Sequence, residues 1–201
     1  MNSFEQEIKT KLLSLSEKGK VLFSVLTCEK LYPHYIAFEA KYKWGNSKLF
    51  ADAISLTYEF LINSKAVSVD EIKDTLSKID LATPDMDDFG SALSSFALNA
   101  ATSTYSTLQY LLDGKIDHIT DVVSYTLDTI DMFIQEKEDM STLDPSREIQ
   151  IENDDFMLQE QQRERELINQ LSKISLDAIT DDLIASLRNS RPIIDLSLLS
   201  E

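Results

Sequence analysis

The sequence predicts an all-α fold, a single bundle of seven or eight helices around a central helix over Pro84–Asp113. Only four glycines and four prolines occur among 201 residues, too few for the many tight turns of a β protein. Apolar residues recur every three or four positions, the spacing of one helix face rather than the alternation of a strand. An apolar fraction of 43% is enough for a buried core.

Two helices are expected in the first forty residues. Residues 4–15 carry apolar side chains at helical spacing. The next helix runs from about Lys20 to Tyr32, where Pro33 removes a backbone donor and crowds the preceding turn. We therefore expect a kink at this proline, or a short restart of the helix through Tyr42.

Two further helices follow the turn at Trp44-Gly45-Asn46. Ser47 is the expected N-cap of a helix from Lys48 to Asn63, which is apolar on most sides and should lie deep in the bundle. The tetrad at 68–71, Ser-Val-Asp-Glu, is a capping box that opens a helix ending near Asp80.

The central helix is expected to open at Pro84–Phe89, where acidic residues complement the positive helix N-terminus. Asp113-Gly114 is the predicted stop. Small residues fill the middle of this helix, including Ala97, Ala100 and Ala101. Because small side chains let neighbouring helices approach closely, we place it at the centre.

The clearest amphipathic helix runs from Ile116 to about Glu136. One face is lined with isoleucine, valine and leucine, and the opposite face is acidic. The acidic residues that we select as a candidate binding face are Asp117, Asp121, Asp128 and Asp131.

The last third of the chain is predicted as a long helix over 148–175 and a short one at Leu183–Leu187. Residues 159–166 are polar all round, which indicates a projecting or lightly packed turn. We assign residues 1–191 to one helical domain and 192–201 to an apolar tail. The tail is expected either to pack back on the bundle or to contact a partner.

The charge is strongly negative and unevenly distributed. The formal net charge is −16; residues 1–100 hold 11 basic against 14 acidic residues, and 101–201 hold 8 against 21. Such a field repels phosphate backbones and anionic membranes, so we expect neither a nucleic-acid nor a membrane partner. It attracts a basic protein, although a solvated helix face accounts for the same residues.

The cysteine content and the distribution of apolar residues predict a cytoplasmic protein. Cys28 is the single cysteine, so no internal disulfide can form. The N-terminus has neither the basic nor the apolar region of a signal peptide, and no apolar run approaches the roughly 18 residues that span a bilayer.

No catalytic or cofactor motif is present. The four glycines are isolated, which excludes dinucleotide-binding and phosphate-binding loops. The patterns His-Glu-x-x-His and Gly-x-Ser-x-Gly do not occur, and one cysteine with two histidines is a poor set of zinc ligands. We expect no cofactor.

Glu29 is the one anomalous carboxylate. On a helix it falls within an apolar stripe that includes Leu22, Leu26 and Ile36. Burial there costs several kcal/mol unless the group is paired or hydrogen-bonded. Glu29 is therefore either a general acid or base, with His34 or Tyr32 beside it, or a structural carboxylate satisfied by tyrosine, lysine or backbone donors.

Asp85, Asp87 and Asp88 form a second group. Clustered carboxylate oxygens suit a divalent cation, but first-turn acids at a helix start explain the same residues. We favour the helix start and assign no metal site.

Both segments carry a family resemblance. Cys28-Glu-Lys-Leu-Tyr-Pro-His-Tyr35 with Phe38 and Gly45, and then Pro84-Asp-x-Asp-Asp-Phe89, resemble two signatures of the bacterial proteins grouped as domain of unknown function family 416. The resemblance covers about 15–174 and implies an all-helical bacterial domain without an established activity. The chain departs from the family pattern at His34 and Asn99, where asparagine and aspartate are expected.

Two functions remain open. The leading hypothesis is a non-enzymatic interaction protein that offers the acidic face of residues 113–155 to a basic partner, one version being an immunity protein that neutralises a basic toxin. The alternative is a small enzyme or ligand-binding protein with a pocket around Glu29, Tyr32, His34 and Tyr35. The chain is expected to be a monomer, or a homodimer formed through its tail.

Overall fold

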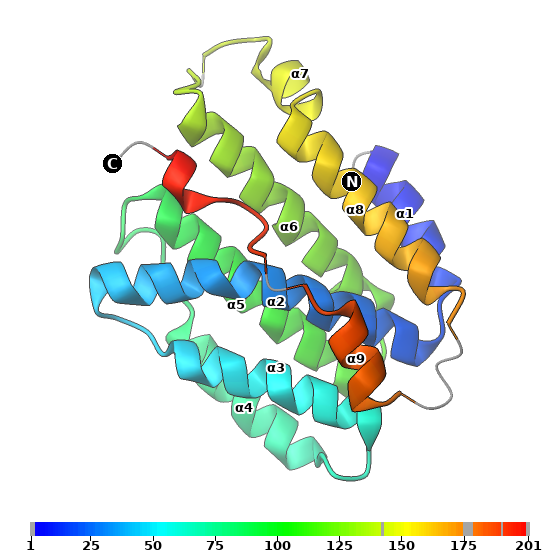
Figure 1. Cartoon of the computed structure of the whole chain (residues 1–201). Coiled ribbons are helices and arrows are strands. Elements are labelled where there is room, and N and C mark those ends of the chain that lie inside the picture. Colours follow the sequence, from blue (N-terminus) through cyan, green and yellow to red (C-terminus); the bar gives the residue numbers. More distant parts are fainter. Residues whose placement is uncertain (1–2, 142, 175–178, 190, 200–201) are drawn as a thin grey trace.

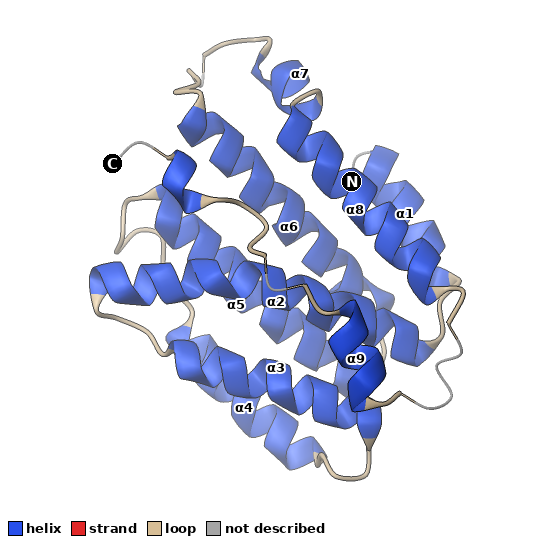
Figure 2. Cartoon of the chain, in the orientation of Figure 1, coloured by secondary structure: helices blue, strands red, loops and turns tan. Residues whose placement is uncertain are grey.

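The computed structural model describes residues 3–141, 143–174, 179–189 and 191–199. Within these ranges all regular structure is helical, and the helices pack into one bundle (Figure 2). The all-α prediction is confirmed. The described residues form nine α-helices, eight of them at least seven residues long.

Figure 1 shows how the helices follow one another along the chain. In chain order they are α1 (Ser3–Leu13), α2 (Glu17–Tyr42), α3 (Ser47–Ile62), α4 (Val69–Ala82), α5 (Ala92–Asp113), α6 (Ile116–Lys137), α7 (Arg147–Glu152), α8 (Asp155–Leu171) and α9 (Asp181–Leu187), followed by the 3-10 turn η1 (Leu196–Leu198).

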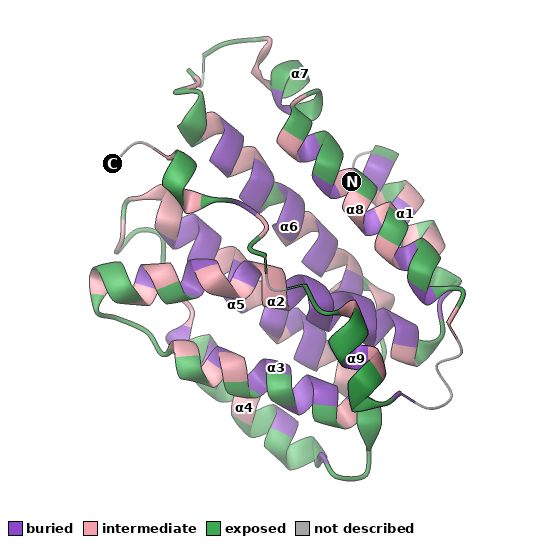
Figure 3. Ribbon diagram, in the orientation of Figure 1, coloured by how far each residue is buried: buried purple, intermediate pink, exposed green. Residues whose placement is uncertain are grey.

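Helices α2 and α5 are the centre of the bundle. On one side α5 contacts α3 and α4, and on the other it contacts α6, which in turn packs against α1 and α8 (Figure 1). The buried surfaces face inward from both sides onto this pair (Figure 3). Ala97 and Ala101 on α5 are fully buried, as expected for small residues at a close helix crossing.

The predicted start of the central helix at Pro84 is wrong, because α5 begins at Ala92. The preceding residues form turns in which Asp85 accepts a hydrogen bond from the Asp87 amide at 3.0 Å. The Phe89 ring packs against Phe38 at 5.0 Å between centroids, and against the neighbouring aromatics Tyr42 and Trp44. Docking of this ring holds the segment off the helix axis.

The predicted restart after Pro33 is also absent, since α2 is continuous from Glu17 to Tyr42. Leu31, Tyr35 and Phe38 lie on both sides of the proline and are fully buried. Their packing offsets the loss of one backbone hydrogen bond. The helix ends at Tyr42, and the next residue, Lys43, has a left-handed backbone (φ 54°) and donates its amide to the Glu39 carbonyl.

The single helix predicted over 148–175 is wrong: α7 ends at Glu152 and α8 runs from Asp155 to Leu171, because Asp154 caps α8 by accepting from the Phe156 amide at 2.8 Å. The last predicted position, 175, lies outside the described residues. The prediction of a lightly packed turn over 159–166 is wrong as well. Glu160 and Glu164 are buried against the bundle. The Arg163 Nε donates to both Glu160 oxygens, at 2.9 and 2.8 Å, so the pair enters the interior together.

Glu164 is the second buried acid of α8, after Glu160. Its carboxyl group is fully buried, and neither oxygen has a hydrogen-bond partner there. Loss of hydration raises its pKa well above the usual value; the nearby Glu160 and Glu5 charges add to this, and Arg163 and Arg165 oppose it. The fold therefore favours the protonated, neutral form of Glu164.

The described part of the tail packs back onto α2, as the first alternative for it predicts. The Ile193 amide donates to the Lys30 carbonyl at 3.1 Å, and Lys30 Nζ donates to the Arg191 carbonyl at 2.8 Å. Ile194 is buried. No helix in the described ranges has the length and apolarity to cross a membrane.

Replacing Glu164→Gln is expected to stabilise the protein at neutral and alkaline pH. Folding raises the pKa of Glu164, so its contribution to stability is complete below the unfolded value of 4.5 and is lost as pH rises through the folded value. Each unit of that rise is worth about 1.4 kcal/mol. Urea unfolding at pH 5 and pH 8 should show a gain for the variant that grows with pH.

The matched control is Glu166→Gln, which removes an exposed carboxylate from the same helix. It should leave the pH dependence of the free energy of unfolding unchanged. A Glu164→Gln variant whose stability follows the wild-type pH profile would contradict the assignment of a raised pKa to this residue.

Candidate functional site

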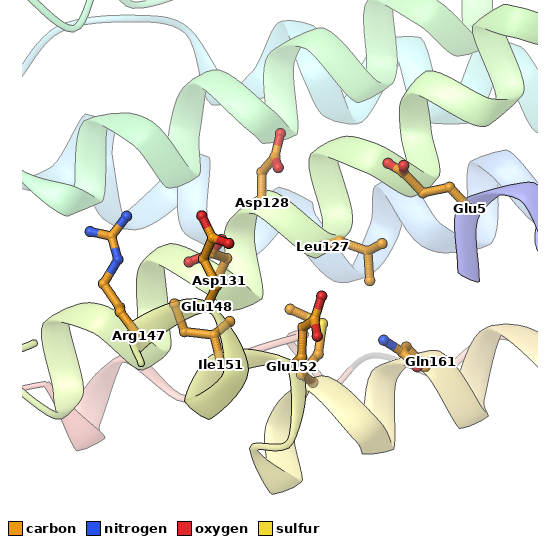
Figure 4. Close-up of a pocket in the computed structure, with 10 residues that line it drawn as sticks. Glu5, Leu127, Asp128, Asp131, Arg147, Glu148, Ile151, Glu152 and Gln161 are labelled. Atoms are coloured by element: carbon orange, nitrogen blue, oxygen red, sulfur yellow. The ribbon is translucent and has the colours of Figure 1, made fainter. Parts of the chain in front are cut away.

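An acidic pocket lies where α1, α6, α7 and α8 meet. It has a volume of about 280 Å³, and Figure 4 shows the side chains around it. Five carboxylates line it against a single guanidinium and a floor of apolar groups. The lining residues are Glu5, Leu127, Asp128, Asp131, Arg147, Glu148, Ile151, Glu152, Met157 and Gln161.

Helix periodicity places these carboxylates. Asp128 and Asp131 are three residues apart on α6 and so share a face, while Leu127 is buried beside them. Glu148 and Glu152 are four apart on α7. The pocket thus receives one acidic pair from each of two helices.

Glu5 completes the site from the first turn of α1. Its neighbours Phe4 and Ile8 are buried, which fixes the rotation of the helix. Ser124 on α6 donates to the Glu5 Oε1 at 2.8 Å. This hydrogen bond ties α1 to α6 beside the pocket.

Among the residues that line the pocket, carboxylates outnumber basic side chains. The Arg147 guanidinium donates to the Gln135 Oε1 at 3.1 Å, an amide rather than a carboxylate. Partial loss of hydration raises the pKa of Asp128, and the charges of Asp131 and Glu5 raise it further. Asp131 and Glu5 therefore repel the charged form of Asp128, and a cation entering the pocket relieves that repulsion.

The structure does not bring the four residues of the predicted acidic face into one pocket. Asp128 and Asp131 join the pocket. Asp117 instead pairs with Lys9 of α1 at 2.6 Å. Asp121 is half-buried, and its pKa is raised mainly by loss of hydration.

Sequence reasoning missed the contribution of Glu5. It lies 119 residues from Ser124, and no local pattern signals that contact. Glu148 and Glu152 fell within the acidic range 113–155 but were not singled out. Their i, i+4 spacing was the available signal.

Glu29 has the contacts of a structural carboxylate. Tyr58 donates to its Oε2 at 2.8 Å, and the Arg188 Nε donates to the same oxygen at 3.1 Å. A second Arg188 nitrogen bonds Oε1. The guanidinium also lies 5.2 Å from the centre of the Tyr58 ring. These contacts link α2, α3 and the end of α9.

Glu29 and His34 line different cavities. Glu29, Tyr32 and Arg188 border one of about 630 Å³. His34 borders another beneath the tail. Tyr35 is directed elsewhere, since its hydroxyl donates to the Ala82 carbonyl at 2.5 Å. The structure does not bring these four residues into one site.

The remaining candidate residues are Cys28 and the three aspartates before α5. Cys28 is buried beside the Thr107 hydroxyl, and loss of hydration raises the pKa of its thiol to about 11. Asp85, Asp87 and Asp88 belong to the exposed turns before α5. Across the described residues, no three histidine, cysteine or carboxylate side chains are placed to hold a metal ion.

Replacing Arg188→Gln is expected to destabilise the protein by roughly 1–3 kcal/mol, because it leaves the Glu29 carboxylate with a single donor in a largely buried place. The Glu29 side chain is only 13% exposed. Urea unfolding measures the loss. The double variant Glu29→Gln/Arg188→Gln should recover part of it, since no unpaired charge is then left behind.

If the loss of free energy of unfolding in the double variant equals the sum of the losses in the two single variants, Glu29 and Arg188 are not energetically coupled. Lys65→Gln, which removes an exposed positive charge from the loop before α4, is the control for the change in net charge. It should shift the free energy of unfolding by no more than about 0.5 kcal/mol.

Comparisons with known proteins agree with this fold. A crystal structure of a DUF416 family protein from Shewanella baltica OS155, at 1.91 Å resolution, superposes with a TM-score of 0.77. The match covers 93% of this chain and 91% of that chain at 19% sequence identity, which shows a shared fold. Among curated proteins there is no significant match.

The sequence profile described as "Protein of unknown function (DUF416)" matches residues 7–197. The matched range begins within α1, ends within the 3-10 turn of the tail, and includes α2 to α9 in full. The chain belongs to the DUF416 family.

Proposed function

We propose that this protein is a non-enzymatic interaction module that presents its acidic pocket, within the acidic face of residues 113–155, to a basic protein partner. The observation that carries the proposal is the convergence of five carboxylates from three helices on one pocket with a single guanidinium. The Arg147 guanidinium is itself directed to an amide.

The size and walls of the pocket suit one lysine or arginine side chain of a partner. A volume of about 280 Å³ is below the roughly 300–1,000 Å³ of most small-molecule sites. Leu127, Ile151 and Met157 provide apolar contact for the methylene groups of such a side chain, and the carboxylates surround its charged end.

The field of the whole molecule supports the same partner. A net charge of −16 speeds the approach of a basic protein and repels nucleic acid and anionic membranes. An immunity protein that neutralises a basic toxin is one version of this function. The enzyme or ligand-binding alternative required Glu29 and His34 in one pocket, and they line separate cavities.

The test compares affinity capture by the wild type with capture by the variant Asp128→Asn/Asp131→Asn/Glu148→Gln. Quantitative mass spectrometry at low and high salt identifies the bound proteins. We expect a basic protein that the wild type retains at low salt, loses at high salt, and that the variant retains at least about tenfold less, since several charge contacts are removed.

A matched control removes the same charge from the opposite side of the bundle. Glu59→Gln/Asp70→Asn/Asp80→Asn changes exposed acids on α3 and α4 (Figure 1). This control should retain the partner as the wild type does. Equal losses in both variants would reduce the effect to net charge, and the absence of any salt-sensitive basic partner would refute the proposal.

A further inference from the structure

Glu164 lies in the middle of the buried face of α8. Met157 and Glu160 precede it by two turns and one turn, and Ile168 and Leu171 follow it at the same spacing. Helix α8 lies at the edge of the bundle and packs on α1, α2 and α6 (Figure 1). The carboxyl group therefore belongs to the interface that holds α8 in place.

The described residues offer this carboxyl group little compensation for its burial. Its side chain is 0% exposed, and neither oxygen has a hydrogen-bond partner there. An Arg163 nitrogen lies 3.8 Å from Glu164 Oε1, but the Nε of that guanidinium donates to Glu160 at 2.9 and 2.8 Å. Arg165 donates to Glu7 at 3.0 and 2.8 Å. An ionised Glu164 is therefore left with one long ion pair and no hydrogen bond.

The charges around Glu164 come from α8 and from the three helices on which it packs. The charged groups of this region are Glu160, Arg163 and Arg165 on α8, Glu5 on α1, Lys30 on α2 and Asp128 on α6. Loss of hydration is the largest influence and raises the pKa of Glu164; the two glutamates raise it further, and the two arginines oppose them. Lys30 acts on Arg163 and Glu160, and Asp128 is influenced by Glu5.

The same helix forms a wall of the acidic pocket. Met157 and Gln161 line the pocket from α8, and Glu164 lies one turn beyond Gln161 on the same side of the helix. Glu5 lines the pocket from α1 and also acts on the pKa of Glu164. A movement of α8 away from α1 and α6 therefore removes one wall of the pocket.

We propose that α8 is a pH-sensitive element, which undocks from the bundle when Glu164 releases its proton to solvent and thereby dismantles the acidic pocket. The neutral carboxyl group can stay in the interface, whereas the carboxylate regains its hydration only if α8 moves away. Because α8 packs at the edge, α2 and α5 stay packed on each other while it opens. The consequence for a basic partner rests on the proposed function of the pocket, and the undocking does not.

Hydrogen exchange of the backbone amides tests the undocking in the full chain, without a partner. Protection factors are measured at pH 6 and pH 8, in urea concentrations below the unfolding transition. We expect the α8 amides to be at least about tenfold less protected than those of α5 and less sensitive to urea, because a local opening exposes less surface than global unfolding.

The protection of α8 should also fall at least about tenfold between pH 6 and pH 8. Folding raises the pKa of Glu164, so the closed state is favoured at low pH and opening becomes easier as pH rises. An opening that releases one proton becomes up to about tenfold more favourable per pH unit.

Two variants remove the ionisable group. Glu164→Gln and Glu164→Met should both make the protection of α8 independent of pH between 6 and 8. The first keeps a polar side chain and the second is apolar, so either one remains informative if the other does not fold. The matched control is Glu166→Gln, which removes an exposed carboxylate from the same helix and should keep the wild-type response.

The proposal would be overturned if the α8 amides showed the protection and urea dependence of α5, or if their protection in the wild type were the same at both pH values. It would also be overturned if the Glu164 variants kept the response to pH, or if Glu166→Gln abolished it. None of these outcomes depends on a partner, so a failure of the undocking is distinguishable from a failure of the proposed function, which affinity capture decides.

Discussion

The close contact of α2 with α5 is the constraint on which the rest of the bundle depends. Ala97, Ala100 and Ala101 on α5 are buried and small, which lets neighbouring helices approach α5 closely. Polar side chains can be buried in this contact because they form hydrogen bonds with backbone carbonyls of their own helix. The hydroxyls of Thr27 and Thr107 each donate to the carbonyl four residues earlier, at 3.0 and 2.9 Å. Ser24 and Thr107 then bond across the interface. With the central pair joined in this way, α3 and α4 cover one side and α6 the other.

Carboxylates in the interior of this molecule have different surroundings from those at its surface. Inside, Glu160 is neutralised by Arg163, and Glu164 is shifted toward its protonated form. At the meeting of α1, α6 and α7, five carboxylates stay together with one guanidinium. Since a stable fold has no need of such repulsion, the acidic pocket is the feature of the structure that most calls for a functional explanation.

Local patterns predicted the helices well and failed where a distant contact outweighed them. The acids after Pro84 are typical of a helix start, but docking of Phe89 on the α2 aromatics holds the segment in turns. The run at 159–166 is polar by composition, yet Arg163 carries Glu160 into the core. Asp128 and Asp131, two of the four residues of the predicted acidic face, line the pocket, and Glu5 of α1 lines it as well.

The sequence by itself determined the helical class, the approximate helix bounds and the acidic second half, because hydrophobic spacing, caps and charge are properties of neighbouring residues. Only the tertiary structure decided which carboxylates meet, how Glu29 is paired and which cavity His34 borders. Those outcomes depend on the relative rotation and position of whole helices, which are set by the summed packing of the core rather than by any local pattern.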